Sequence, residues 1–474
     1  MFGREFLILA AICVLPLSAK QSSNIPEKQT DPKKEDELKK VKDKRCILFK
    51  AFENALSTNK DILAMEYEIK AANESHTQVR AAFLPTIDAN AGFGASDTDS
   101  WVSNMGQKNT SKNRGKTCGL TAKYNIFHGL ADVAALKEIN LQLRARWSRY
   151  EATKQKVLRE VAAYYFEIYA KMQELRHLNA LLESRKGSLE VVSEMFKAGS
   201  AKYLDVAQAT AGCAEVEAMI AKAQANYESL RAKFTELTGY VLPNTFDVPE
   251  KLIDPKMPVK QGIDLAMRNN PNIIAAADNL AAAREAARKP IGKLLPTLDI
   301  SCGLHNSLTQ NPGADNSNNR EQTFQVALKW QLYDGGVGRS EKRQAQELAC
   351  KAAIEKEKAI EETRTEIVST WATLDAARRN LESANQAVKA RWLALEDITK
   401  EHLSGTKIMN DVLKAQHEYF EAQTLVIQAQ KEYLTAQSTA AALVGRMNQR
   451  YLKLAVPSSE FNYEQHLSRV RGRV

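Results

Sequence analysis

Four segments of the chain alternate apolar and polar residues with the two-residue period of a β-strand. In the first of them, Ile87, Ala89, Ala91 and Phe93 alternate with polar or glycine residues. A period of two indicates strands that have one apolar and one polar face. Each segment has about ten residues, the length that a tilted strand needs to cross a membrane. The four predicted strands are residues 86–96, 116–126, 297–307 and 322–333.

The alternation alone does not distinguish two kinds of sheet. A small soluble sheet with one buried face has the same pattern as strands that face lipid on one side and water on the other. Four strands cannot close a barrel alone, so the membrane interpretation requires several copies of the chain to remove the open edges of the sheet.

A second pattern, apolar residues at every seventh position, follows each pair of predicted strands. A sustained seven-residue period predicts a left-handed coiled coil. Helices are therefore expected over residues 129–197 and 337–402, and at this length each would reach roughly 100 Å. In the second half of the chain the repeated positions are Ile360, Ile367, Leu374, Leu381, Val388 and Leu395. In the first half they are Val161, Ile168, Leu175, Leu182 and Leu189.

The chain contains an internal repeat, which predicts two structural halves. The stretch LTAKYNIFHGL at 120–130 matches VALKWQLYDGG at 326–336, and FKAGSAKYLDVAQA at 196–209 matches HLSGTKIMNDVLKA at 402–415, both at an offset of 206 residues. An earlier pair, 81–94 and 292–305, is offset by 211 residues, so one loop is five residues shorter in the second half.

Each half is expected to run helix, strand, loop, strand, long helix, turn, helix. The loops are placed at 97–115 and 308–321, and the remaining helices at 46–83, 202–238, 262–293 and 407–446. The predicted division of the chain is a first repeat at 46–238, an equatorial connector at 239–261, a second repeat at 262–446, and an equatorial segment with a tail at 447–474.

The amino terminus has the features of a secretory signal peptide. Arg4 precedes an apolar run, Phe6 to Leu17, that is too short to span a bilayer, and Ser18-Ala19 provides small residues for cleavage. The alternative is a buried core helix. Residues 1–19 are therefore predicted to be removed, and the charged residues 20–45 to form a flexible lead-in.

The distribution of charged residues, histidines and cysteines argues against several classes of function. The 66 basic and 57 acidic residues are interleaved, so no nucleic-acid-binding stripe is expected. The seven histidines form no helical pair, and the glycines at 335–338 lack the lysine of a phosphate-binding loop. The cysteines form no close pair that would indicate a disulfide framework or a zinc site. No enzyme activity, cofactor or metal is predicted.

With these features the sequence resembles the TolC-like outer membrane efflux proteins, the channels of type I secretion and tripartite efflux systems. The resemblance covers residues 46–450 and rests on three sets of motifs. They are the Leu-Pro pairs before the strands at 84–85 and 295–296, the WQLYDGG at 330–336, and the tip motifs AGSAKYLDV at 198–206 and SGTKIMNDVLKA at 404–415.

The resemblance implies a mainly helical fold with transmembrane strands. Three copies would form a homotrimer with one twelve-stranded β-barrel in outer membrane lipid, continued by a coiled-coil α-helical barrel through the periplasm. It also implies passive export of drugs and/or secreted proteins, with a periplasmic adaptor and an inner-membrane pump of the ABC, RND or MFS type as partners. The alternative is a secreted periplasmic coiled-coil scaffold without a pore.

Two groups of site residues follow from the resemblance. Gly129, Gly335 and Gly336 are expected at the strand-to-helix hinges. The adaptor-docking tips are expected at Ala198, Gly199, Ser200, Ser404, Gly405 and Thr406.

A periplasmic gate is the third expected site. Asp205 stands where the family has the aspartate of a polar latch, while Lys407 and His402 replace its arginine and tyrosine partners. Lysine keeps the charge but loses the bidentate geometry of arginine. Asp411 stands at the constriction, and Lys414 replaces a second aspartate one turn further on, within expected side-chain reach of Asp411. The alternative is that these are ordinary exposed helix charges.

Overall fold

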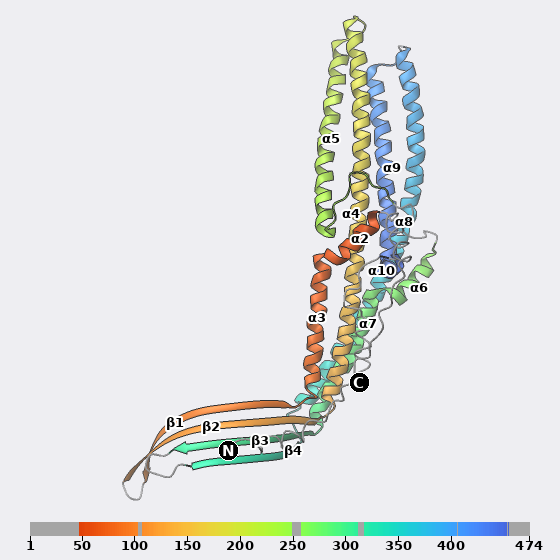
Figure 1. The fold of residues 1–474 in the computed structure, drawn as a ribbon. Coiled ribbons are helices and arrows are strands. Elements are labelled where there is room, and N and C mark those ends of the chain that lie inside the picture. The colour runs from red at the N-terminus through yellow and green to blue at the C-terminus, as the bar shows by residue number, and fades with distance from the viewer. Residues whose placement is uncertain are drawn as a thin grey trace, which may run out of the picture. The chain divides into compact units, whose positions relative to one another are not determined.

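A computed structural model describes residues 47–102, 107–248, 257–310, 317–404, 406–452 and 454. The predicted signal peptide and lead-in lie outside these residues, as do most of the predicted tail and part of the connector. Within the described chain, long helices lie beside one another between a four-stranded sheet and two hairpin turns (Figure 1). The predicted fold class, mainly helical with four strands in each chain, is confirmed.

The sheet joins the two halves of the chain. Its strands are β1 (Thr86–Val102), β2 (Gln107–His128), β3 (Thr297–Gln310) and β4 (Ser317–Lys329), in that order and all antiparallel. The β2–β3 pairing therefore connects the first repeat to the second. One register row runs across all four strands and is apolar throughout: Ile87, Ala122, Cys302 and Phe324.

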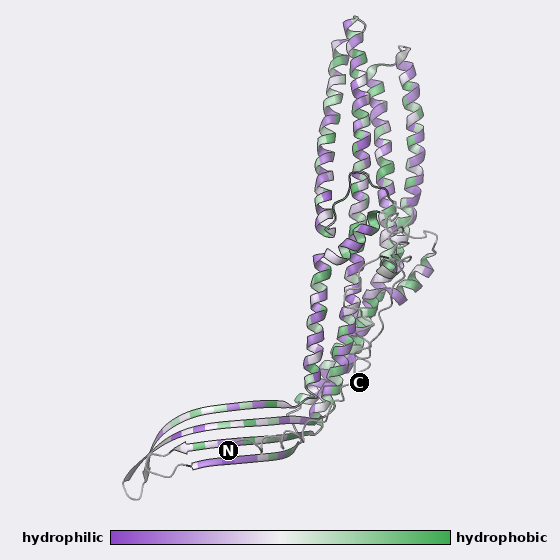
Figure 2. Cartoon of the chain, viewed as in Figure 1, coloured by the Kyte–Doolittle hydropathy of each residue, from purple (hydrophilic) through white to green (hydrophobic). Residues whose placement is uncertain are grey.

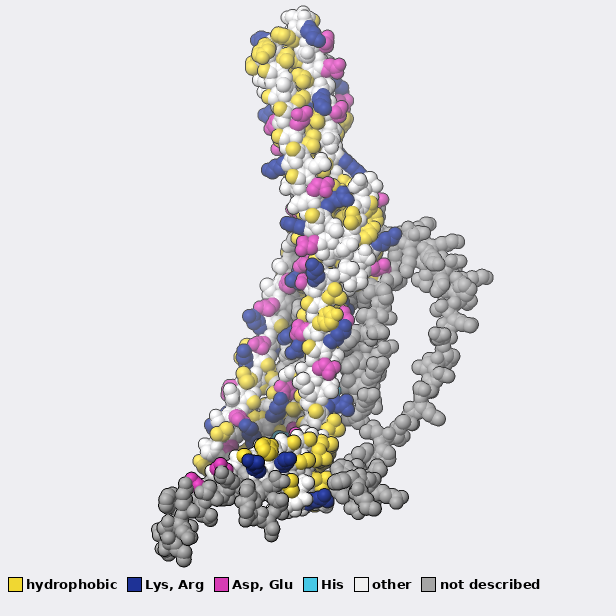
Figure 3. Space-filling model, turned by 60° about the vertical axis from the view of Figure 1, so that its left-hand side comes forward, with side chains coloured by type: hydrophobic (Ala, Val, Ile, Leu, Met, Phe, Trp, Pro, Cys, Tyr) yellow, Lys and Arg dark blue, Asp and Glu magenta, His cyan; other side chains and the backbone are white. Residues whose placement is uncertain are grey.

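The apolar face of the sheet is not covered by any other described part of the chain. Phe93 and Phe324 are 71% and 72% exposed, and Ile87 is 68% exposed. Figure 2 shows the alternation along the strands, and Figure 3 shows hydrophobic side chains gathered on the sheet. The sheet therefore does not have the buried face that a soluble sheet of a single chain would require.

The strands are longer than the sequence predicted. The loop predicted at 97–115 is mostly strand, because β1 continues to Val102 and β2 begins at Gln107, with Ser100 opposite Asn109. Residues in this region are mostly polar and apolar residues no longer alternate with them, so the sequence pattern that marks a strand is lost while the backbone ladder continues. The loop predicted at 308–321 is likewise partly strand, and β4 ends at Lys329 instead of residue 333.

The four long helices follow the seven-residue pattern closely. They are α4 (Ala131–Lys197), α5 (Tyr203–Thr238), α8 (Val337–Leu403) and α9 (Met409–Leu443). Each begins and ends within three residues of its predicted position. No helix in the described part of the chain is long and apolar enough to cross a membrane.

Each remaining predicted helix is broken at an asparagine. Residues 46–83 form α2 (Ile47–Thr58) and α3 (Lys60–Ala81), and the Asn59 side chain between them accepts hydrogen bonds from the N–H groups of Asp61 and Ile62. In the second half, α6 (Val259–Asn269) and α7 (Pro271–Ala286) meet at Asn270, which accepts from Asn272 N–H. Asparagine is a strong N-cap, and proline fits the first helical position, so both breaks have a local cause. The 3₁₀-helix η1 (Lys289–Leu294) and α10 (Gln449–Leu452) complete the elements.

The largest hydrophobic core lies midway along the helices. Phe52 of α2, Tyr165 and Phe166 of α4, and Phe234 of α5 are completely or almost completely buried in it. The Tyr165 hydroxyl donates to the Asp247 carbonyl at 2.7 Å, which fastens the connector to α4. This cluster therefore holds the first helical hairpin, α2 and the connector together.

The 3₁₀-helix η1 contacts both junctions at which a strand passes into a long helix. At the first junction, Gly129 has a φ of +59°, and a Cβ on it would lie 2.6 Å from the Gly292 Cα. At the second, Trp330 Nε1 donates to the Leu294 carbonyl at 3.2 Å. An ion pair of 2.6 Å between Lys293 and Glu341 ties η1 to α8 as well. One short segment thus holds both long helices against the sheet.

The second junction is shaped by Asp334 and two glycines. Gly335 and Gly336 have φ angles of +70° and +88°, in the left-handed region that favours glycine. The Asp334 carboxylate accepts hydrogen bonds from Gly336 N–H at 2.9 Å and Gly338 N–H at 2.6 Å. These bonds to the ionised form hold the pKa of Asp334 below its usual range. The aspartate therefore holds the two glycines in place and satisfies one N–H group in the first turn of α8.

Gly129 and Gly335 form a matched pair for mutation. We expect Gly129→Ala to reduce the amount of folded protein in the outer membrane strongly, because the new methyl group would meet the Gly292 backbone. Gly335→Ala has open space around it and should cost only about 1–2 kcal/mol for the left-handed backbone. The yield and thermal midpoint of detergent-extracted protein measure both effects. Equal losses in the two variants would show that the Gly129–Gly292 contact has no special role.

Candidate gate and docking site at the helical tips

The first tip is a tight turn between α4 and α5. Gly199 has a φ of +76°, and the N–H groups of Ser200 and Ala201 both donate to the Met195 carbonyl, at 2.9 and 3.2 Å. A left-handed glycine just past the end of a helix closes such turns. The predicted docking residues Ala198, Gly199 and Ser200 are all exposed here.

Asp205 has a local partner in this tip. It is the third residue of α5, and its Oδ2 accepts from the Lys202 backbone N–H at 3.0 Å. A carboxylate in the first turn is also stabilised by the helix dipole. In the single chain, therefore, the half-buried Asp205 side chain holds the start of its own helix.

Exposed apolar side chains surround the first tip. The rings of Phe196 and Tyr203 meet edge to face across the turn with their centroids 6.3 Å apart. Tyr203 is 73% exposed, and Met195 and Leu204 are exposed beside it. Figure 3 shows hydrophobic side chains at this end of the helices. An apolar surface at an otherwise charged helical end is typical of a contact surface.

The second tip, between α8 and α9, has a different chemistry. The Ser404 hydroxyl donates to the Glu401 carbonyl at 2.8 Å, and Thr406 N–H donates to the same carbonyl at 2.9 Å. His402 Nδ1 donates to the Lys407 carbonyl at 2.9 Å, which spans the turn. Ser404 and Thr406 are exposed, and the predicted Gly405 lies outside the described residues.

The predicted gate residues lie at the same end of the chain without forming the predicted links. Among the ion pairs of the described residues there is none between Asp205 and Lys407 or His402, and none between Asp411 and Lys414. Asp411, half-buried, is the third residue of α9, as Asp205 is of α5. Lys414 is exposed. The gate therefore remains a prediction for the assembled protein.

The two tips are joined by an apolar cluster that was not predicted from the sequence. It contains Val192 of α4 and Met409, Val412 and Leu413 of α9, with Val206 of α5 and Ile398 of α8 packed against it. Its available signal was the spacing of apolar residues on α9, close to the predicted constriction. The cluster sets the distance between the two hairpins at their ends.

Nothing in the described residues suggests chemistry at a bound group. No cluster of three or more histidine, cysteine, aspartate or glutamate side chains in this part of the chain could hold a metal ion. The tips therefore offer shape, charge and apolar contact.

Comparison with known proteins connects this fold to a family. The family described as "Outer membrane efflux protein" matches residues 51–240 and 262–446, most of the chain. The outer membrane efflux protein BepC of Brucella suis is 24% identical over 75% of this chain and 77% of its own length. The outer membrane protein TolC of Escherichia coli is 23% identical over 85% of this chain and 83% of its own.

The fold is also shared with a solved structure. The Campylobacter jejuni CmeC outer membrane channel superposes with a TM-score of 0.73 at 15% identity, over 89% of this chain and 88% of its own. Proteins of this family are channels and not enzymes, and they lie in the outer membrane and extend into the periplasm. The chain thus belongs to the outer membrane efflux protein family.

Proposed function

We propose that this outer membrane efflux protein works as a homotrimeric channel that passively exports drugs and/or secreted proteins across the periplasm and outer membrane. The single observation that supports the proposal most is the sheet. Its apolar face is exposed, and its outer strands, β1 and β4, each have a strand neighbour on one side only within the described chain.

Open edges in lipid must be paired. An unsatisfied backbone group in hydrocarbon costs several kcal/mol, so a membrane sheet has to close on itself. Three copies, with β4 of one beside β1 of the next, would give twelve strands without an edge. The row Asp88, Thr121, Gly303 and Thr323 lies on the opposite face from the row of Ile87 and would line the water-filled interior.

The helices support the same assembly. The apolar side chains Leu348, Ile354, Trp392 and Leu393 of α8 are exposed in the single chain. They lie outside the seven-residue stripe, whose Ile367 and Leu374 are buried within the chain, so a second apolar surface of α8 is free to pack against a helix of a neighbouring copy. The pore-free scaffold is the weaker alternative, because it explains neither the exposed apolar face nor the open edges of the sheet.

The helical tips are the proposed periplasmic end. Their exposed turns would receive a periplasmic adaptor, which links the channel to an inner-membrane pump of the ABC, RND or MFS type. Residues 1–19 would direct export of the chain and be removed. In the trimer, Asp205 would meet Lys407 and His402, and copies of Asp411 would surround the axis. Each exposed latch contact is worth only about 0–1 kcal/mol, so the closed state would open easily.

Assembly is tested by mass and conductance together. Protein extracted from outer membranes in detergent should have a mass near three times that of the mature chain and should form channels in planar bilayers. A monomer without conductance would support the scaffold instead.

Orientation is tested by labelling intact cells. The ends of the β1–β2 and β3–β4 hairpins should face the cell exterior, because residues 97–115 and 308–321 are rich in Asn, Ser, Gly and Asp and differ in length between the two halves. A tag inserted near Asn109 or Asn316 should react without opening the outer membrane. Reaction only after the outer membrane is opened would contradict this topology.

The constriction is tested by a pair of opposed substitutions. A ring of Asp411 carboxylates should favour cations, and Lys414 should oppose that field. Lys414→Asp should therefore shift the reversal potential in a salt gradient toward cations, and Asp411→Asn should shift it the other way. Asp205→Ala should raise the single-channel conductance. If none of these variants differs from the original channel, the residues neither line nor latch the pore.

A further inference from the structure

We propose that Arg185 is a positioning residue of the channel, a buried tie that fixes the first turns of α9 to α4. Those turns carry Asp411 and Lys414. This inference rests on the proposed function, since it concerns how the proposed constriction is held in place.

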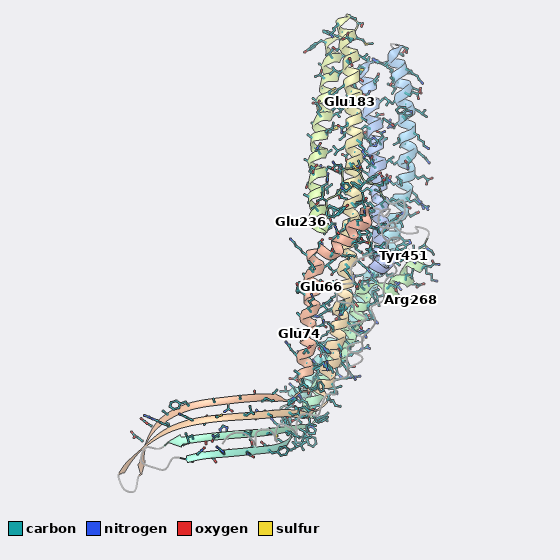
Figure 4. The ribbon with its side chains drawn as sticks, viewed as in Figure 1. Glu66, Glu74, Glu183, Glu236, Arg268 and Tyr451 are labelled. Atoms are coloured by element: carbon teal, nitrogen blue, oxygen red, sulfur yellow. The ribbon has the colours of Figure 1, made fainter. Side chains whose placement is uncertain are left out.

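The tie is formed by one side chain and a backbone carbonyl. Arg185 projects from α4 and is only 6% exposed. Its Nη2 donates to the Leu413 carbonyl at 2.9 Å, a bond between residues 228 apart in the chain. Leu413 lies two residues after Asp411, so the bond holds α9 directly beside the proposed constriction. Glu183, two residues before Arg185, marks this level of α4 in Figure 4.

The neighbouring helix leaves room for the guanidinium group. Gly212 of α5 faces it, and a Cβ at Gly212 would lie 3.0 Å from Arg185 Nη1. Cys213, the next residue, is buried. Arg185 therefore lies in a layer formed by α4, α5 and α9 within one chain, so its contacts do not depend on the trimer.

A second polar side chain crosses the same interface in the opposite direction. Gln416 of α9 is buried, and its Nε2 donates to the hydroxyls of Ser184 at 3.0 Å and Ser188 at 3.4 Å. Gln416 is three residues from Leu413, so the two connections lie within about one helical turn. Together they fix both the height and the rotation of α9 against α4, which non-directional apolar contacts do not.

Stability does not explain a charge at this position. None of the ion pairs found among the described residues includes Arg185, and burial holds its pKa below the ordinary value although the charge of Glu215 on α5 opposes that shift. Arg185 Nε and Gln416 Oε1 are buried without hydrogen-bond partners in the described chain. A buried charge that no carboxylate contacts directly costs free energy, and apolar replacements of buried charges are often neutral or stabilising. Geometry is therefore the role that the contacts support.

The buried tie differs physically from the exposed latch. Contacts of Asp205 with Lys407 or His402 would lie near solvent and weaken as salt is raised. The bond from Arg185 to Leu413 is shielded from salt. A channel with both should retain part of its closed-state restraint at high ionic strength.

The test compares Arg185→Met with Lys186→Met in the full trimer. Methionine fills similar space without the hydrogen bonds, whereas Lys186 is an exposed neighbour on the same helix with an ion pair of its own to Glu183. We expect Arg185→Met to raise the single-channel conductance at high salt and to leave the thermal midpoint unchanged or higher. Lys186→Met should leave the conductance and thermal midpoint unchanged.

A second readout does not depend on the pore. Amide hydrogen exchange in residues 409–416 should become about tenfold faster in Arg185→Met, as expected for loss of a charged hydrogen bond. Exchange in residues 427–443 should stay the same. Arg185→Lys keeps the charge but lacks the several N–H donors of the guanidinium group. Its exchange rate at residues 409–416 should lie between those of the original protein and Arg185→Met.

The outcomes separate this inference from the proposed function. Faster exchange at 409–416 in a protein that never conducts would support the tie and overturn the proposed channel. Normal exchange and conductance in Arg185→Met would overturn the tie and leave the channel intact. A lowered thermal midpoint with unchanged conductance would make Arg185 a purely structural residue, which also overturns the tie.

Discussion

The contact between the backbones of Gly129 and Gly292 determines how the sheet is joined to the helices. It lies where the chain leaves β2 and enters α4. A Cβ on Gly129 would meet the Gly292 backbone, and a Cβ on Gly292 would meet the Ala131 Cβ at 2.7 Å. The segment that carries Gly292 also receives Trp330 from the second junction. Both long helices are thus oriented by a single 3₁₀-helix of six residues.

The two copies of the internal repeat differ in the segment that holds the junctions between strands and helices. At the offset of 211 residues, Gly292 corresponds to Ala81, which ends α3 as an ordinary helical residue. Glycine is needed in the second copy because that segment packs against the junction of the first half. The two halves therefore have the same order of elements, while the segment of the second half provides the contacts to both junctions.

The sequence predicted the long helices well because one physical signal, the seven-residue apolar period, runs through their whole length. The prediction was wrong where the apolar alternation ends but the strands continue. Beyond residue 96, β1 and the facing part of β2 are mostly polar and lack the apolar alternation, and backbone pairing between the two strands continues the ladder. The helix breaks at Asn59 and Asn270 had a readable cap, but the apolar pattern continued across them.

The sequence predicted where the candidate site residues lie, but it did not predict which groups they contact. The repeat placed Asp205 and Asp411 at the two tips, yet a sequence does not show that Asp205 caps its own helix. Arg185 gave no signal at all, since an arginine in a charge-rich helix normally faces solvent. Its burial depends on Gly212 and Leu413, residues distant in the chain that meet only in the folded protein.

The difference between the tips has a consequence for symmetry. At the 206-residue offset, Phe196 corresponds to His402 and Tyr203 to Met409, so an exposed aromatic pair lies at one tip and a histidine–carbonyl turn at the other. In the proposed trimer, the rim would be nearly sixfold in backbone but only threefold in chemistry. A partner built from identical subunits that covered every tip would therefore meet two different contact surfaces. Each subunit would need a surface that binds both an apolar and a polar tip, or the subunits would have to bind in two orientations around the rim.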